Sequence, residues 1–292
     1  MRVTDASTSL GSLAGLQSAA SRLASLQAQL SSGQQITRPS DDPSGTFRAL
    51  QLRGDVKRNT QYGANAQDAV GWMSTADSAY SQAVKLAQSA RTLVVQGLNT
   101  GATSSASASA IADQLDAIRT SLIQVANTTY NGRPVFGGTT AGNIAYDSAG
   151  NYVGDAGAVS RTIGAQATVQ INQTGPQAFG PPGSDLFTLL SNISATLRTN
   201  PSAAAPQLTA LDTALSRISS AQAAEGATYQ QVQNTQSVQS TTGTSLATQL
   251  SNLQDIDLAD MSVKVSTANV TYQAALQTTA SVRQLSLLNF LR

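Results

Sequence analysis

Apolar residues recur at spacings of three and four along the last fifty residues of the chain, from Thr244 to Arg292. This spacing places them on one face of a helix, which then needs an apolar partner. The same alternation runs through the first thirty residues. We therefore expect the two ends of the chain to pack together and to leave apolar surface that one copy does not cover. The positions expected to make assembly contacts are Leu13, Leu16, Leu23, Leu30, Leu258, Met261, Val265, Tyr272, Val282 and Leu288.

The same stripes allow a second interpretation. Packing between the two terminal helices of a single copy would use the same residues, which would then serve only as intrachain core. A polar substitution at Leu23 together with Val265 separates the two hypotheses. Lost assembly with an unchanged middle of the molecule favours assembly contacts, whereas global unfolding favours the core.

The first two helices have clear boundaries in the sequence. The first helix should end near Gly33, because a serine pair followed by glycine offers a left-handed terminus. A second helix should begin at Asp42 and Pro43, where a capping carboxylate precedes a proline at the first helical position. Its apolar spacing continues to about Leu98, which makes it very long. Paired carboxylates at Asp41 and Asp42 could also suggest acid/base chemistry, but no other catalytic group accompanies them.

Apolar spacing predicts two further helices. The Ser/Ala/Gly-rich segment 99–109 predicts a turn, and apolar spacing over 111–125 predicts a helix after it. From 208 to 253 the three-four alternation is unbroken, although its middle is polar. The register is lost at 254–257, which predicts a joint between this helix and the terminal one. The acidic residues there, Asp255, Asp257 and Asp260, favour a solvated kink over a metal cluster.

The pattern changes between residues 133 and 183, where short runs, of which 167–171 alternates between apolar and polar residues, are separated by glycine-rich turns. Such runs are typical of strands. The expected strands cover 134–136, 144–146, 151–153 and 167–171, with a hairpin turn at 147–151. A calcium loop at that turn is disfavoured, because acidic ligands do not recur at alternate positions. After the insert, Ser184 is expected to cap a short helix that runs to Leu197.

These expectations define a mainly α protein, a long antiparallel helical bundle or coiled coil built from both chain ends, with one small β-rich insert. We divide the chain into five segments. They are the N-terminal helix and linker of a terminal layer (1–42), the first part of the bundle (43–132), the β-rich insert (133–183), the second part of the bundle (184–254) and the C-terminal helix of the terminal layer (255–292).

The composition narrows the possible functions. The chain of 292 residues has a formal net charge of +1, which favours neither nucleic acid nor an acidic partner. It has no cysteine and no histidine, so thiol chemistry and the commonest general base are missing. No apolar run approaches the roughly 18 residues of a membrane span. We predict no catalytic, cofactor-binding or metal-binding residue and no membrane insertion.

Two sets of residues resemble the bacterial flagellin superfamily. At the N-terminal side these are Ser32, Gly33, Asp41, Asp42, Pro43 and Asn65, and the closing run 286–291 is similar to the superfamily's C-terminus. In the insert and directly before it, Asn131, Gly132, Phe136, Gly138, Gly154 and Asp155 resemble the hook-associated members. Three features depart from the pattern: Gln34 and Gln35 replace an expected basic residue, Pro134 interrupts a strand entry, and Arg292 extends the end.

The resemblance implies a structural, non-enzymatic protein that connects the flagellar hook to the filament. It implies a ring of subunits held by the terminal helices, with a sister hook-associated protein on the hook side and flagellin on the filament side. It also implies an export chaperone and secretion to the bacterial flagellum by type III export, without a cleavable signal peptide. No cofactor is expected.

Three other functions remain open at this point. Filament flagellin shares both ends of the chain. A secreted helical tip or translocator protein would need a long membrane-active apolar hairpin, which the sequence lacks. An enzyme using Asp41 and Asp42 would need further catalytic groups. The sequence has no histidine, no cysteine and no glycine-rich loop of the kind that binds phosphate, which counts against this function.

Overall fold

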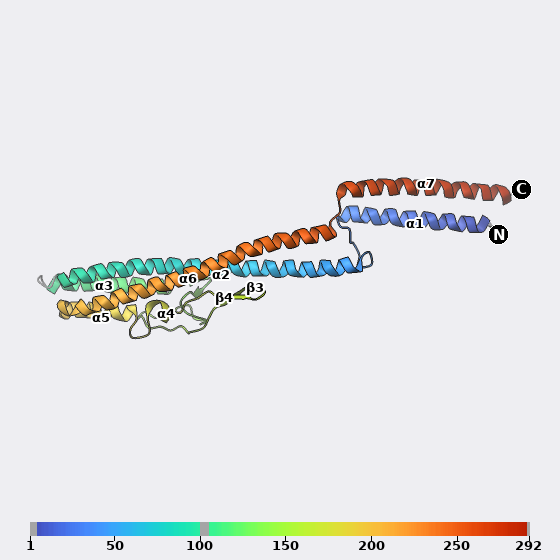
Figure 1. Ribbon diagram of the computed structural model, residues 1–292. Helices are drawn as coiled ribbons and strands as arrows, with labels where there is room; N and C mark the ends of the chain where they lie inside the picture. Colours follow the sequence, from blue (N-terminus) through green and yellow to red (C-terminus); the bar gives the residue numbers. More distant parts are fainter. Residues whose placement is uncertain (1–4, 100–104, 291–292) are drawn as a thin grey trace. The chain divides into compact units, whose positions relative to one another are not determined.

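The computed structural model describes residues 5–99 and 105–290, and the side chains of residues 10–99 and 106–281. Helices dominate this part of the chain, as predicted (Figure 1). They are α1 (Asp5–Ser32), α2 (Pro43–Asn99), α3 (Ser105–Ala126), α4 (Gly175–Phe179), α5 (Leu186–Thr199), the 3-10 helix η2 (Pro201–Ala204), α6 (Ala205–Gln254) and α7 (Leu258–Phe290). The contacts divide the chain into two compact units, Met1–Arg58 with Gly243–Arg292, and Asn59–Thr242. The five-segment division stays a prediction.

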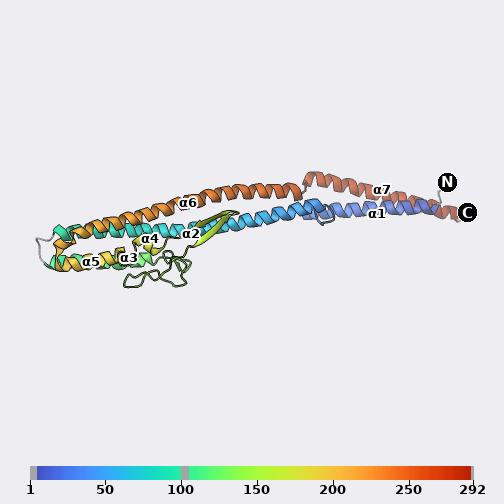
Figure 2. The ribbon, with the colours of Figure 1, turned by 60° about the horizontal axis from the view of Figure 1, so that its bottom comes forward.

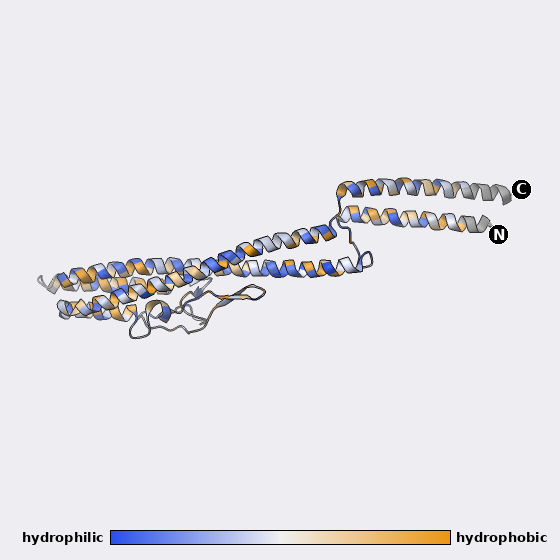
Figure 3. Ribbon diagram, in the orientation of Figure 1, coloured by the Kyte–Doolittle hydropathy of each residue, from blue (hydrophilic) through white to orange (hydrophobic). Residues whose placement is uncertain are grey.

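The first unit contains the two terminal helices. α1 and α7 lie side by side and antiparallel, with both chain ends at the same end of the pair (Figures 1 and 2). Hydrophobic residues recur along both helices (Figure 3). The prediction that the two ends of the chain meet is therefore confirmed. α1 ends one residue before Gly33, whose φ of 70° is the left-handed terminus expected there.

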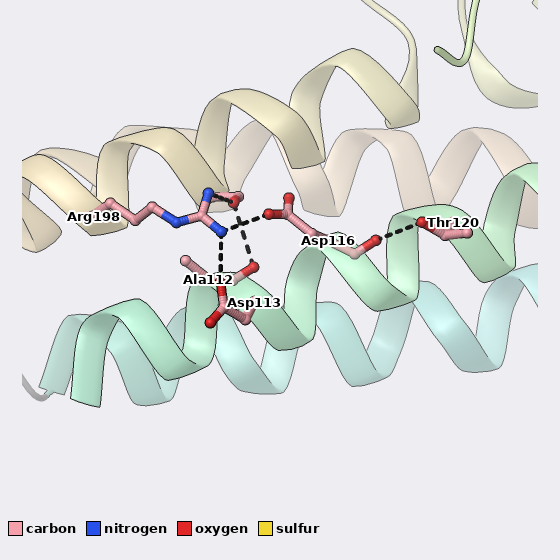
Figure 4. A network of polar contacts seen from close by, with 6 residues as sticks. Ala112, Asp113, Asp116, Thr120 and Arg198 are labelled. Atoms are coloured by element: carbon pink, nitrogen blue, oxygen red, sulfur yellow. Dashed lines mark hydrogen bonds and ion pairs between the residues drawn. The ribbon is translucent and has the colours of Figure 1, made fainter. Parts of the chain in front are cut away.

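The second unit is a bundle of α3 and α5 with the parts of α2 and α6 that belong to it. Alanines of α2 are buried at intervals of seven and three or four, which lets neighbouring helices approach closely. Ion pairs at the surface join the helices across the bundle. Arg91 of α2 pairs with Asp212 of α6 at 2.5 Å. Arg198 of α5 contacts both Asp113 and Asp116 of α3 at 2.7 Å (Figure 4).

The insert contains less sheet than its sequence predicts. β1 (Thr129–Tyr130) pairs with β2 (Arg133–Pro134), and β3 (Ser160–Gly164) pairs with β4 (Ala167–Gln170), both antiparallel. The runs 144–146 and 151–153 contribute only the single bridge between Tyr146 and Tyr152, around the turn predicted at 147–151. Burial alternates along 167–171, where Val169 and Ile171 are buried, but not along 134–136, where all three residues are buried. Most of the insert is loop held by side chains.

Three local predictions were wrong. The turn expected over 99–109 was placed too broadly, because α2 includes Asn99 and α3 already begins at Ser105, where its alanines favour helix. α5 is capped by Asp185 and not by Ser184, since the Asp185 carboxylate accepts a hydrogen bond from the Thr188 amide at 2.9 Å. The strand predicted at 134–136 is displaced, because β2 covers only Arg133–Pro134 and pairs with β1 at Thr129–Tyr130.

Candidate functional site

The joint at the start of α2 is built by two adjacent carboxylates. Asp42 accepts hydrogen bonds from the Gly45 amide and the Ser44 hydroxyl, both at 2.9 Å, and so caps the helix. Asp41 accepts from the Thr37 hydroxyl at 2.9 Å and from the Arg38 amide at 2.9 Å. These bonds hold the pKa of each carboxyl below its usual value, led by the Gly45 amide for Asp42 and the Thr37 hydroxyl for Asp41.

Both carboxylates therefore stay charged and act as caps for backbone groups. A general acid needs the opposite shift, toward neutral pH. The sequence hypothesis of an enzyme using Asp41 and Asp42 has no support in this geometry. Within the described residues no group of three acidic side chains is placed to hold a metal ion. Nor does any helix there have the length and apolar character to cross a membrane.

The joint between α6 and α7 is tied to the linker that follows α1. The Gln35 amide donates to the Gln254 carbonyl at 2.6 Å, and the Ile256 amide donates to the Gly33 carbonyl at 3.1 Å. The Gln254 side chain is buried and accepts a hydrogen bond from Arg53 at 3.1 Å. The joint predicted at 254–257 is confirmed, and its backbone groups are satisfied by the other end of the chain.

The predicted assembly residues divide between two kinds of position on α1 and α7. Leu16, Leu23, Leu30, Val265 and Tyr272 are half-buried. Met261 is only 6% exposed, whereas Leu13 and Leu258 are 41% and 63% exposed. The side chains of Val282 and Leu288 lie outside the described residues. Most of the described set is thus at least half-buried where α1 and α7 lie side by side, and its role in assembly stays a prediction.

A second apolar face on α7 was missed by the stripe analysis. Val263 and Val270 are 65% and 63% exposed. Each follows a buried residue of the inner stripe, Met261 or Ala268, by two positions, which is a rotation of about 200° around the helix. Both valines are therefore largely exposed on the outer side of α7, and Val263 also borders a groove that it lines together with Ala19, Arg22 and Leu26 of α1. The signal was present in the sequence as a second repeat of seven residues, weaker than the first.

Several superfamily-type residues fix the insert. Asn131 and Gly132 form the β1–β2 turn, with φ values of 50° and 77°. Gly138 has a φ of 72°, and a side chain there would meet the Asp155 backbone. The Asp155 carboxylate accepts from the Thr139 amide at 2.6 Å, and this bond is the first cause of its lowered pKa. Gly154 lies against the ring of Tyr152.

Two further residues of that set link the insert to the bundle. The Asn65 side-chain amide donates to the Thr162 carbonyl at 2.8 Å. Phe136 is buried edge-on against Tyr80 of α2 and Phe179 of α4, with ring centroids 5.1 Å and 5.2 Å apart. The sequence marked both positions only by resemblance, because the partners lie far away along the chain.

Glu225 is the one strongly perturbed carboxyl of the described bundle. It lies on α6 and is 6% exposed, and neither carboxylate oxygen has a hydrogen-bond partner among the described residues. Burial raises the pKa of Glu225 to about 8, with a smaller contribution from the charge of Asp77. Its position in the polar middle of the long α6 seam was visible in the sequence, but its burial was not.

Comparison with known proteins places these features in a family. Residues 5–141 match the model of the bacterial flagellin N-terminal helical region, and residues 208–291 match that of the bacterial flagellin C-terminal helical region. The chain is 28% identical over 291 residues to flagellar hook-associated protein 3 of Salmonella typhimurium, covering 91% of this chain and 90% of that protein. It is 27% identical over 297 residues to flagellin of Bacillus subtilis, covering 97% of each.

The fold is shared with a solved structure as well. A putative flagellar hook-associated protein from Vibrio parahaemolyticus superposes with a TM-score of 0.68 at 18% identity, over 74% of this chain and all of that one. The two family models together span both ends of the chain and most of its helical bundle. The chain therefore belongs to the bacterial flagellin family, whose members are structural proteins.

Proposed function

We propose that this chain is a hook-associated protein 3 type subunit, which joins the flagellar hook to the filament. The observation that carries the proposal is the paired α1 and α7, which cover each other along one stripe and leave Val263 and Val270 of α7 exposed. Exposed apolar side chains in register on a long helix favour burial by another polypeptide. The full-length similarity to hook-associated protein 3 of Salmonella typhimurium supports the same role.

The proposal also covers the assembly, the partners and the export of the subunit. Subunits associate in a ring, contact a sister hook-associated protein on one side and flagellin on the other, and are exported with a chaperone by the type III route without a cleavable signal. The residues that the sequence predicts as assembly contacts remain part of the proposal, and Val263 and Val270 are added to them. The inner residues build the α1–α7 pair, and the outer face with Val263 and Val270 contacts neighbouring subunits.

Filament flagellin is the second candidate. The similarity to flagellin of Bacillus subtilis is as extensive as that to hook-associated protein 3, so identity alone does not separate the two roles. The roles differ in what the purified subunit does. A filament subunit grows into long polymers, whereas a junction subunit stops at a short oligomer.

Replacing both outer valines tests the proposal. The double variant Val263→Gln/Val270→Gln should keep its fold, because both side chains are exposed, and should no longer support filaments on hooks in cells that lack the native gene. Val238→Gln is the matched control, because Val238 of α6 is 64% exposed and lies in the other unit. Normal filaments with the double variant would contradict a role for this face.

A further inference from the structure

The first turns of α2 expose their large apolar residues and bury their small ones, which is the reverse of an ordinary amphipathic helix. Phe47 and Leu50 are 62% and 60% exposed, while Ala49 is 2% exposed and Gly45 is buried. The two large apolar side chains thus face outward, and the smallest residues of the segment face the rest of the unit. A helix selected only for stability of one copy would have the opposite arrangement.

Gly54 continues the same outward face. It follows Leu50 by one turn, and a side chain added there would meet only the tip of Arg58, at 3.7 Å. A glycine inside a helix costs about 1 kcal/mol relative to alanine. No close packing within the described residues requires it here. A backbone free of a side chain next to Phe47 and Leu50 suits close approach by another polypeptide. We call Phe47, Leu50 and Gly54 the α2 ridge.

The surroundings of the ridge are basic. Between residues 48 and 58 there are four basic side chains, Arg48, Arg53, Lys57 and Arg58, against one acidic side chain, Asp55. Arg48 lowers the pKa of Asp42 in the same copy, Arg53 binds Gln254, and Arg58 pairs with Asp55. Lys57 takes part in none of the ion pairs formed within the described residues.

The joints of the same unit carry the complementary charge. Five acidic residues lie at the starts of α2 and α7, against the two basic residues Arg38 and Lys264. We call these five the acidic joint: Asp41, Asp42, Asp255, Asp257 and Asp260. In the part of the chain that the structure describes, no ion pair connects the acidic joint to the basic residues around the ridge. Most of these groups have partners within one copy: Asp41, Asp42, Asp255 and Asp257 accept hydrogen bonds, and Asp260 pairs with Lys264. The basic side chains around the ridge and all of the acidic joint except Asp42 are nevertheless exposed, so the net positive charge around the ridge and the net negative charge of the joint can attract another molecule.

We propose that the α2 ridge is a docking surface for the acidic joint of a second copy of this chain. The contact is head-to-tail, because two ridges facing each other would bring like charges together. A head-to-tail contact is the kind that closes into a ring when the rotation between copies closes. The inference rests on the proposed function, because it names a contact by which the subunits associate, and it involves residues outside the α1–α7 pair.

The apolar part of the proposal is tested by truncating the ridge. Sedimentation velocity of the full chain at low salt should show mass increasing with concentration. Phe47→Ser/Leu50→Ser should weaken this association at least tenfold. The matched control is Ile144→Ser/Val153→Ser, which removes two side chains of 47% and 48% exposure from the insert and should change nothing. Equal effects of both double variants, or no association of the unaltered chain, would overturn the proposal.

The charge part is tested by a swap between copies. Lys57→Glu/Arg58→Glu makes the surroundings of the ridge acidic, and Asp255→Lys/Asp260→Lys makes the joint basic without removing a helix cap. Each variant alone should fail to associate, because its own ridge and joint repel. An equimolar mixture should recover association, because each surface then meets its complement on the other variant. If the mixture stays monomeric while both variants remain folded, the head-to-tail contact is wrong.

Failure of this inference can be told apart from failure of the proposed function. If the ridge variants associate and build filaments normally while Val263→Gln/Val270→Gln does not, the ridge proposal falls and the junction role stands. If the unaltered chain does not join hooks to filaments in cells but its association in solution depends on the ridge, the junction role falls instead. Ridge variants that associate normally but fail in cells would indicate a different protein as occupant, which also overturns the proposal.

Discussion

The backbone amide of Ile256 donates a hydrogen bond to the carbonyl of Gly33 at 3.1 Å, although the two residues belong to opposite ends of the chain. The carbonyl is available there because Gly33 adopts a φ of 70° directly after α1. The linker after α1 and the joint before α7 therefore form one hydrogen-bonded connection, at which α1 ends and α7 begins.

Gly33→Ala should weaken the terminal unit by about 1 kcal/mol, because an alanine is strained at positive φ although there is space for its side chain. Gly11→Ala is the control. Gly11 lies within α1 with open space around it, so alanine should stabilise that helix by roughly 0.5–1 kcal/mol. Hydrogen exchange of the α1 amides measures both effects. The same sign for both substitutions would contradict the account of the joint.

Glu225 should make the bundle less stable as pH rises. Its pKa is about 8 in the folded protein and near 4.5 when exposed, so the folded state binds more protons between these values. The stabilisation is complete below pH 4.5 and is lost as the pH rises through 8, at up to about 1.4 kcal/mol per unit. Denaturant unfolding at pH 5, 7 and 9 measures it.

Glu225→Gln is the control for this pH dependence, because it keeps the size of the side chain and cannot ionise. Its stability should lose the component that falls between pH 5 and 9. Asp77 is the charged group that adds to the shift, so Asp77→Asn should make the fall smaller without removing it. Identical slopes for the unaltered chain and Glu225→Gln would show that the pKa of this carboxyl is the same in the folded and unfolded states, which would contradict the effect of burial.

Phe136→Ala should destabilise the second unit by about 3–5 kcal/mol, because it removes a buried ring that packs on Tyr80 and Phe179. Val153→Ala in the same insert removes an exposed side chain and should change the stability by less than about 0.5 kcal/mol. Thermal unfolding followed by near-ultraviolet circular dichroism reports the aromatic packing. A small effect at Phe136 would mean that the insert is not part of the cooperative unit.

Leu23→Gln/Val265→Gln should loosen the α1–α7 pair and stop assembly while the second unit keeps its stability, because both residues are half-buried on helices of the first unit. Limited proteolysis should then remove the chain ends faster than in the unaltered protein. Loss of both units together would instead mean that these residues support the whole fold.

The sequence predicted best where a local rule decides the structure. Gly33, the Asp42 and Pro43 pair, and the register break at 254–257 each locate a helix boundary, and all three were correct. The insert was predicted less well, because its strands have two to five residues and depend on partners such as Asn65 and Asp155. Alternation over 167–171 marks the buried Val169 and Ile171, but it does not reveal the hydrogen bonds that hold the rest of the insert.

The candidate surfaces were also predicted only in part, because the sequence shows the apolar stripes but not which of them are covered. The strongest apolar stripes predicted contact between α1 and α7, and much of each stripe is used within one copy. The exposed residues Phe47, Val263 and Val270 were not singled out, because a helical pattern does not say which of two apolar faces is covered. Glu225 was visible as a polar residue in a seam, but only the packing around it shifts its pKa.

Electron microscopy of the purified chain added to isolated hooks tests the central claim most directly. A junction subunit should form a short ring on the hook end and should not extend when more subunit is added. Flagellin added afterwards should then grow from that ring. Long filaments formed by this chain alone, or hooks left bare by it while flagellin still polymerises on them, would contradict the account.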